Sequence, residues 1–251
     1  MELLNCYTFW LMVKKKLCIF NWSGGKDSTL ALHYALQDPS ISIKYLVTTV
    51  TEKYNRVSMH GVRESLLIEQ ANSIGIPLYQ IRLPEMPDMD TYDRIMHHHL
   101  SIFKQEGISH SIFGDIFLED LRAYREAKLK DVGLEAIFPL WQQDTKQLIQ
   151  QFLNLNYKTI IVCAQYNLKS FCGKVIDNDL IASLPSVIDP CGENGEFHTF
   201  AFEGPVFRNK IAFETGEMVF RSYKKPSVND DLSSEITEDD EELGFWFADL
   251  K

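Results

Sequence analysis

The first half of the chain alternates short apolar runs with segments of helical spacing. Four apolar runs have the length and side-chain character of β-strands: 16–22, 44–50, 78–83 and 111–116. Four segments between and after them repeat apolar residues at helical spacing: 29–36, 62–74, 89–105 and 118–130. This alternation predicts an α/β fold, in which a parallel sheet has helices on both faces.

The pattern changes in the second half. Asp144 followed by Gln147 indicates the start of a helix, and 158–164 predicts one more strand. Residues 212–223 resemble a hairpin turning at Thr215-Gly216, and 245–250 predicts a terminal strand. We expect three parts: an α/β domain at 1–131, a smaller α+β domain at 132–227, and an acidic loop with a terminal strand at 228–251.

Composition limits the class of protein. The chain of 251 residues is 45% hydrophobic and 24% charged, with a net charge of -10, which disfavours non-specific binding to nucleic acid or anionic membrane. Five cysteines without a CxxC pair indicate a reducing compartment and argue against a zinc or iron–sulfur site.

No apolar run reaches the ~20 residues of a membrane span. The lysines at 14–16 follow the apolar stretch at the start of the chain, whereas in a signal peptide the positive charges precede it. We therefore expect a cytoplasmic protein. Either Met1 or Met12 could be the first residue, and the chain could form a homo-oligomer.

The strongest local signal is the segment between the first predicted strand and helix, 23–28, which reads SGGKDS. Adjacent glycines let the backbone approach an anion, and the N-terminus of the following helix favours a phosphate there. The order is not that of a Walker A loop. Asp27 would repel phosphate unless Mg²⁺ lay between them, so the segment predicts a metal-bridged pyrophosphate of ATP, with Asp27 as a metal ligand. The alternative is an ordinary glycine turn capped by Asp27 or Ser28.

Three stretches carry a resemblance to known families. SGGKDS resembles the SGGxDS signature of PP-loop ATP pyrophosphatases, which cleave ATP to AMP and pyrophosphate. The segment 56–78, which contains MHGVRE, and the segment 189–200, DPCGENGEFHTF, resemble the diphthine–ammonia ligase family and its bacterial relatives. The resemblance covers about 16–223 and implies a Rossmann-like, HUP-type sheet. It also implies amide synthesis, in which ATP adenylates the carboxylate of diphthine, a modified histidine on elongation factor 2, and ammonia attacks; a bacterial relative would use another carboxylate.

The resemblance and the residue chemistry together assign candidate roles. The expected nucleotide-binding residues are Ser23, Gly24, Gly25, Lys26, Asp27, Ser28, His60, Gly114 and Asp115. The expected substrate-binding residues are Glu193, Glu196, His198 and Thr199, and the expected catalytic residues are Asp27, Glu196 and His198. Carboxylates would favour ammonium, and Glu196 or His198 would accept its proton.

Each assignment has a plainer alternative. His60 could cap a helix or pack, and Asp115 could cap the following helix. The segment 189–200, which we call the late segment, could be a solvated turn. Tyr124 and Arg125, on the helix after Asp115, could reach the site, but we expect them to pack or face solvent. The side chains of His97-His98-His99 in a helix cannot converge on one metal, so a surface run is expected there. Two other functions stay open: a PP-loop enzyme that modifies tRNA, as a thiolase or lysidine-type synthetase, and a nucleotide-binding module without turnover. The acidity and the absence of a CxxC pair weigh against the tRNA enzyme.

Overall fold

The computed structural model describes residues 15–57, 61–222 and 244–251. Five strands of its first sheet run parallel in the order β4-β2-β1-β5-β6. Their bounds are β1 Lys16–Asn21, β2 Ile41–Thr51, β4 Leu78–Leu83, β5 His110–Ile112 and β6 Glu135–Ile137. The short β3 (Arg56–Val57) pairs antiparallel with β2. Strand order reverses beside β1, so the carboxyl ends of β1 and β5 border the crevice where open α/β sheets bind ligands.

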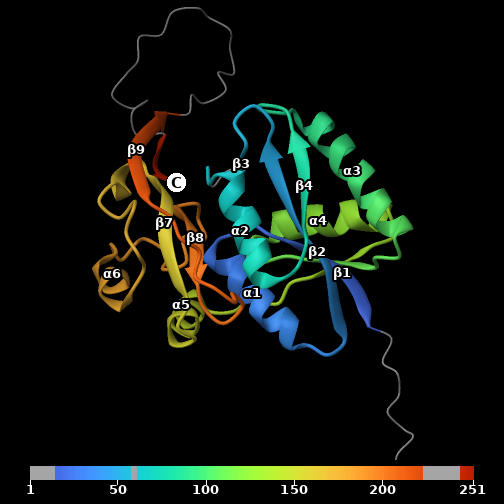
Figure 1. The fold of residues 1–251 in the computed structure, drawn as a ribbon, viewed down its shortest axis with the longest axis horizontal. Helices are drawn as coiled ribbons and strands as arrows, with labels where there is room; N and C mark the ends of the chain where they lie inside the picture. The colour runs from blue at the N-terminus through green and yellow to red at the C-terminus, as the bar shows by residue number, and fades with distance from the viewer. Residues whose placement is uncertain (1–14, 58–60, 223–243) are drawn as a thin grey trace, which may run out of the picture.

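Helices cover both faces of this sheet, which confirms the expected α/β class (Figure 1). Alternate side chains of β1 point to opposite faces, as a strand requires. Phe20 packs in one core with helices α1 (Lys26–Gln37) and α2 (Glu64–Ile74). Ile19 packs in the other core with α3 (Met89–Gln105) and α4 (Glu119–Asp131).

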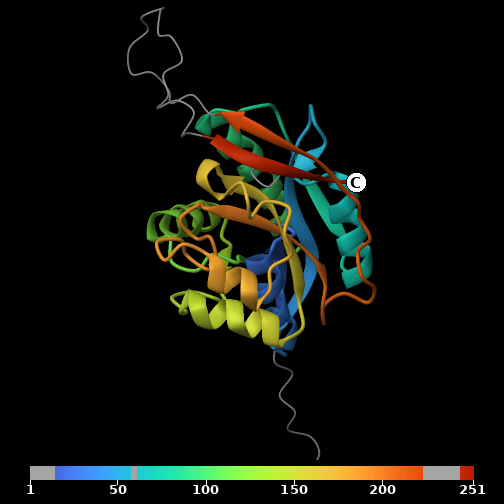
Figure 2. The same cartoon turned by 90° about the vertical axis from the view of Figure 1, so that its left-hand side faces the viewer.

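The second half forms an antiparallel sheet in the order β8-β7-β10-β9. These strands are β7 Lys158–Gln165, β8 Phe197–Glu203, β9 Thr215–Ser222 and β10 Gly244–Leu250. Helix α5 (Thr145–Asn154), the 3-10 turn Tyr166–Leu168 and α6 (Asn178–Ser183) accompany this sheet (Figure 2). Phe200 of β8 belongs to the same hydrophobic core as Phe20 of β1. The two halves of the chain therefore share one core.

Several local predictions are confirmed. Helix α3 has the predicted bounds, and the Asp144 carboxylate accepts a hydrogen bond from the Gln147 N–H at the start of α5. The predicted terminal strand is β10. The strand predicted at 111–116 is β5, which ends at Ile112. The first sheet continues to Ile137 in β6, beyond residue 131.

The predicted hairpin at 212–223 is wrong. Thr215 begins the single strand β9, whose partner is β10 from the far end of the sequence. Glu214 and Lys251 exchange two backbone hydrogen bonds at the edge of this pair. The alternating apolar pattern correctly indicated a strand at β9. Its partner strand β10 is distant in sequence, so no local signal predicts the pairing. His60, Met1, Met12 and the acidic segment at 229–242 lie outside the described residues.

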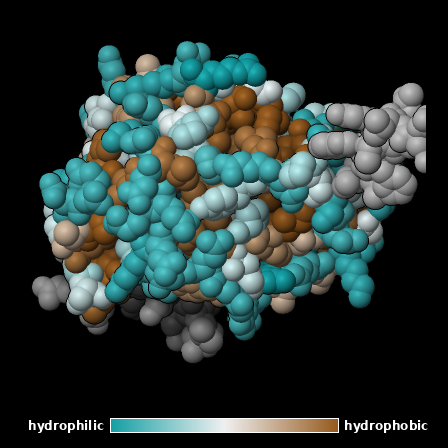
Figure 3. All heavy atoms as spheres, turned by 90° about the horizontal axis from the view of Figure 1, so that it is seen from below, coloured by the Kyte–Doolittle hydropathy of each residue, from teal (hydrophilic) through white to brown (hydrophobic). Residues whose placement is uncertain are grey.

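Hydrophilic side chains cover much of the face seen in Figure 3, with apolar atoms exposed in patches between them. Exposed apolar side chains elsewhere on the chain include Met86 and Val187. Scattered exposure of this kind is normal for a folded chain. Within the described part of the chain, no helix has the length and apolar character needed to cross a membrane.

An ionic cluster fixes the last strand to the first sheet. Asp249 on β10 lies 2.9 Å from a guanidinium nitrogen of Arg56 and 2.7 Å from one of Arg63. Hydrogen bonds from Arg63, opposed by burial and reinforced by Arg56, lower the pKa of Asp249 to about 2. The end of the chain is thereby tied to the segment that joins β3 to α2.

We expect Asp249→Asn to lower the free energy of unfolding at neutral pH by about 1–2 kcal/mol, because it removes the charge that both arginines contact. The folded-state pKa lies below the unfolded one, so this contribution is present above pH ~4 and is lost as pH falls from ~4 towards 2. Urea titrations of both proteins at several pH values measure it. A matched control is Glu85→Gln, which breaks the exposed pair with Lys53 and should have a smaller effect. A difference that did not shrink with falling pH would contradict this explanation.

Candidate functional site

The segment 23–28 comprises the turn after β1 and the first residues of α1, which begins at Lys26, at the carboxyl edge of the parallel sheet. We call it the phosphate loop. Gly24 has φ +79°, a left-handed conformation that favours glycine. The loop leads into the N-terminus of α1 at Lys26, where backbone N–H groups of the first turn have no partner inside the helix. Its geometry is therefore that of an anion-binding turn.

The second half of the chain holds this loop directly. The Lys26 N–H donates to Thr199 Oγ1 at 2.9 Å, and the Ala201 N–H donates to the Gly24 carbonyl at 2.8 Å. Both partners lie on β8. The antiparallel sheet therefore packs against the phosphate loop itself.

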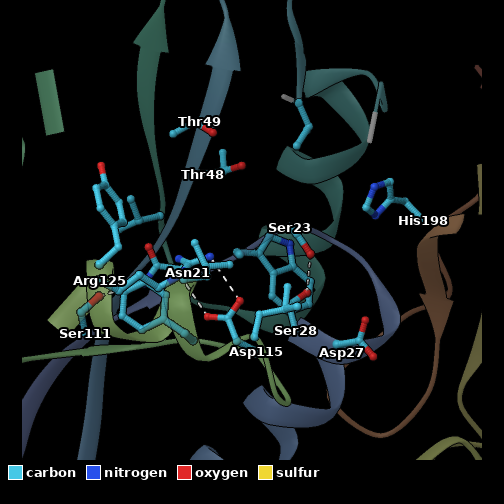
Figure 4. Close-up of a pocket in the computed structure, with 18 of the residues that line it drawn as sticks. Asn21, Ser23, Asp27, Ser28, Thr48, Thr49, Ser111, Asp115, Arg125 and His198 are labelled. Atoms are coloured by element: carbon cyan, nitrogen blue, oxygen red, sulfur yellow. Dashed lines mark hydrogen bonds and ion pairs between the residues drawn. The ribbon is translucent and has the colours of Figure 1, made fainter. Parts of the chain in front are cut away.

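A cavity of about 880 Å³ opens beside the loop, and both halves of the chain line it (Figure 4). The predicted site residues that line it are Ser23, Lys26, Asp27, Ser28, Gly114, Asp115, Glu193, His198 and Thr199. Three predicted site residues in the described part of the chain do not line the cavity: Gly24 and Gly25, which belong to the loop, and Glu196. The structure thus brings together residues from three widely separated segments.

Lys26 and Asp27 form an ion pair at the start of α1. Lys26 Nζ lies 2.8 and 2.7 Å from the two carboxylate oxygens of Asp27 and 5.7 Å from the centre of the Phe197 ring. Burial works to lower the pKa of Lys26, but the charges of Asp27, Cys191 and Glu193 outweigh it and raise that pKa. Lys26 therefore carries a positive charge inside the cavity wall.

Asp115 lies across the cavity from the late segment, beside Arg125 of α4. Arg125 donates to Asp115 Oδ1 at 3.2 Å, while its Nε lies 3.0 Å from Oδ2 without the alignment of a hydrogen bond. Burial raises the pKa of Asp115, Arg125 opposes this shift, and Asp27 adds to it. The alternative that Asp115 caps the next helix is wrong, because the residue at the N-cap of α4 is Leu118. Tyr124 and Arg125 both line the cavity, so of the two alternatives that the sequence left open for them, the structure favours the one in which they reach the site.

Glu196 does not face the cavity. Its carboxylate is buried, with 4% of the residue exposed, and it accepts hydrogen bonds from the Asp189 N–H, the Asn194 N–H and the Asn194 side chain at 2.8–3.0 Å. Burial works to raise the pKa of Glu196, but these donors outweigh it and lower that pKa. This differs from the expected substrate-binding and catalytic position: the carboxylate holds its own loop together.

Glu193 and His198 lie in the cavity wall instead. Burial, together with the negative charge of Asp27, raises the pKa of Glu193 to about 8. Burial, together with the positive charge of Lys26, lowers the pKa of His198 to about 4. His198 is thus a neutral imidazole at neutral pH, and the low pKa of its protonated form makes it a weak base towards an ammonium proton.

Asn21 and Gln70 are among the residues that sequence reasoning missed. Asn21 ends β1, lines the cavity, and donates to Ser111 Oγ and to the Ile112 carbonyl, which ties β1 to β5. Gln70 on α2 hydrogen-bonds the backbone of the phosphate loop. The position of Asn21 at the end of the first strand, two residues before Ser23, was a usable signal, whereas a glutamine inside a helix carries none.

No group of three or more His, Cys, Asp or Glu side chains in the described part of the chain is arranged to hold a metal ion. Mg²⁺ usually binds through one or two carboxylates together with substrate phosphates. Asp27 supplies such an oxygen donor at the phosphate loop, with about a third of its side chain exposed. The donor set therefore fits a metal that arrives with a nucleotide better than a resident metal centre.

Comparison with known families covers most of the chain. Residues 16–136 match the diphthamide synthase N-terminal domain, and residues 144–225 match the diphthamide synthase C-terminal domain. Among curated proteins, the diphthine–ammonia ligase of Bos taurus is 32% identical over 47% of this chain and 45% of that protein. The diphthine–ammonia ligase of Homo sapiens is 25% identical over 61% of this chain and 63% of that protein. The chain thus spans about half to two thirds of the length of these relatives.

Among solved structures, the U34-tRNA thiolase NcsA from Methanococcus maripaludis with its [4Fe-4S] cluster is 16% identical. The likeness covers 58% of this chain and 60% of that chain, with a TM-score of 0.38. A likeness this weak carries no argument about function.

We expect Glu196→Gln to lower the free energy of unfolding by about 1–2 kcal/mol. The carboxylate accepts hydrogen bonds from Asn194, whereas the NH₂ group of a glutamine is itself a donor and would lie against one of those donors. The matched control is Glu193→Gln, three residues away, which replaces a carboxyl group whose pKa burial raises to about 8 and should leave stability unchanged or raise it. Urea titration at neutral pH compares the two. Equal destabilisation by both substitutions would contradict the separate roles that we give these carboxylates.

Proposed function

We propose that this chain, which belongs to the diphthamide synthase family, is an ATP-dependent ligase that activates a substrate carboxylate with AMP and joins it to ammonia. The observation that carries the proposal is the shared cavity. The phosphate loop and the late segment with Glu193 and His198 line the same space, although about 165 residues separate them. If the phosphate loop binds ATP and the late segment binds the second substrate, this shared cavity would hold them side by side, as group transfer requires.

The phosphate loop would bind the pyrophosphate end of ATP. Its backbone turn, the N-terminus of α1 and the charge of Lys26 all favour an anion. Asp27 would hold Mg²⁺ against the phosphates, in place of or beside its pair with Lys26. When bound there, the metal would supply positive charge that neutralises the phosphates and orients them for displacement.

The reaction would proceed in two steps. A carboxylate oxygen of the substrate attacks the α-phosphorus of ATP, and pyrophosphate leaves with the electrons of the broken P–O bond. Ammonia then attacks the acyl carbon, AMP leaves, and one proton passes from nitrogen to a base. Activation is needed because a carboxylate is a poor electrophile, whereas acyl-AMP has a good leaving group.

The name of the relatives, diphthine–ammonia ligase, supports ammonia and diphthine as the substrates. The carboxylate would then belong to a modified histidine on elongation factor 2, with another small carboxylate as the alternative. Glu193 would contact the ammonium, because its carboxyl group lines the cavity. With a pKa of about 8 this group is mostly protonated at neutral pH, so it would attract the cation only after losing its proton. His198 would act as a neutral hydrogen-bonding group, and Glu196 would position the loop. His60 stays a predicted nucleotide contact.

The runner-up remains a tRNA-modifying enzyme of the PP-loop class, and the third alternative is a nucleotide-binding module without turnover. The net charge of -10 weighs against the tRNA enzyme. The buried charges around the phosphate loop weigh against the module, because such charges are costly unless a function retains them. A cytoplasmic location and the oligomeric state stay predictions.

ATP turnover with ammonium and a diphthine-bearing elongation factor should release AMP and pyrophosphate, because the loop has the PP-loop form. Ion-exchange chromatography of the nucleotides and an enzymatic assay for pyrophosphate measure both products. Omission of Mg²⁺ should stop the reaction. Release of ADP would contradict the proposed chemistry.

We expect Asp27→Asn to lower metal-dependent turnover by about 100-fold, which corresponds to ~2.7 kcal/mol of lost transition-state stabilisation. The control is Asp38→Asn, at the exposed far end of α1, which should leave turnover unchanged. Steady-state rates over a range of Mg²⁺ concentrations, with thermal unfolding of each variant, measure the effect. Turnover of a folded Asp27→Asn variant within a fewfold of the parent would exclude Asp27 as a metal ligand.

Binding to tRNA should be weak, because the acidic chain offers little favourable contact to a phosphate backbone. Fluorescence titration with tRNA at several salt concentrations checks this expectation. Affinity tighter than ~1 µM with a steep salt dependence would make the tRNA enzyme the leading interpretation.

A further inference from the structure

Gln70 lies in the middle of α2 with no exposed surface. Its side-chain carbonyl accepts a hydrogen bond from Trp22 Nε1 at 2.9 Å. Its amide nitrogen donates to the Gly24 carbonyl at 3.0 Å and to the Ala201 carbonyl at 2.6 Å. Both donors and one acceptor position of the amide are therefore used. Two of the bonds end in the connection between β1 and α1, and the third ends on β8.

These two segments meet where the phosphate loop contacts β8. Trp22 precedes the loop, Gly24 lies within it and Ala201 lies on β8. A Cβ atom at Gly24 would lie 2.7 Å from Gln70 Oε1, so the backbone of the loop is in close contact with this amide. Gln70 is absent from the cavity lining and can act on a bound nucleotide only through the loop.

We propose that Gln70 is a positioning residue that fixes the phosphate loop against β8, so that the second half of the chain becomes a structural part of the ATP site. The inference rests on the proposed function only in that the loop binds the phosphates of ATP. Loop amides contribute to phosphate binding only when they converge on the anion, and a displacement of about 1 Å costs up to ~100-fold in an organised site.

The same helix provides a matched control. Ser73, one turn further along α2, donates to the Asn209 carbonyl at 2.7 Å and accepts from the Asn209 N–H at 3.0 Å. These bonds also join α2 to the second half of the chain, but they lie away from the phosphate loop. If Gln70 only docked the two halves together, loss of the Ser73 bonds would have the same consequences.

The test compares Gln70→Leu, which keeps the side-chain size and removes the amide, with Ser73→Ala in the full chain. Isothermal titration with Mg²⁺-pyrophosphate and with a non-hydrolysable ATP analogue gives affinities, and thermal unfolding gives stability. We expect both variants to unfold at lower temperature. Only Gln70→Leu should bind the two ligands about 10- to 100-fold more weakly. In the ligase assay its KM for ATP should rise, while its KM for ammonium stays within about twofold.

If Gln70→Leu does not fold, Gln70→Met decides the question, because it also removes the amide and its flexible side chain fits the same space more readily. Weaker binding by either Gln70 variant with parental binding by Ser73→Ala supports the proposal. Parental binding by a folded Gln70 variant, or equal loss in the Ser73 variant, overturns it. If the parent protein itself does not bind ATP or pyrophosphate, the proposed function is refuted. If only a Gln70 variant loses binding, the result supports the positioning role of Gln70 and leaves the proposed function unchanged.

Discussion

The hydrogen bond from the Ala201 N–H to the Gly24 carbonyl joins the two halves of this chain at their functional centre. Around it, Gln70 donates to the carbonyls of both residues, and Thr199 accepts from the N–H of Lys26. A phosphate loop on a parallel sheet is usually shaped by its own strand and helix. Here an antiparallel sheet from the second half completes that shape, and residues of both halves pack in one hydrophobic core.

Charge organises the same centre. Lys26 is buried among acidic groups, and a buried charge is stable only when it is paired and hydrogen-bonded. Asp27 is the partner of Lys26 in that ion pair. Glu193 lies in the same cavity wall, and its pKa is raised to about 8. A bound nucleotide and Mg²⁺ would bring opposite charges to these groups. The carboxylates therefore suit a site that binds a metal–phosphate complex and a cationic nitrogen source in turn.

Much of the fold follows from local sequence, because periodicity and caps are local properties. The alternation around β1 and α1 and the cap at Asp144 specify their elements without help from distant residues. The pairing of β9 with β10 does not follow, since the partner strand lies beyond residue 243. The site divides in the same way: the glycines and Asp27 are evident in sequence, whereas Glu196 points into its own loop and Gln70 reads as an ordinary helix residue. Which carboxylate faces the cavity depends on backbone hydrogen bonds that only the folded loop reveals.

We propose that residues from both halves of the chain build one ATP site. Hydrogen–deuterium exchange read by mass spectrometry, with and without Mg²⁺ and a non-hydrolysable ATP analogue, is the most direct test. We expect slower exchange of backbone amides in two separate regions, the phosphate loop at 23–28 and the late segment at 189–200. Protection of the phosphate loop alone, with unchanged exchange in the late segment, would contradict this proposal.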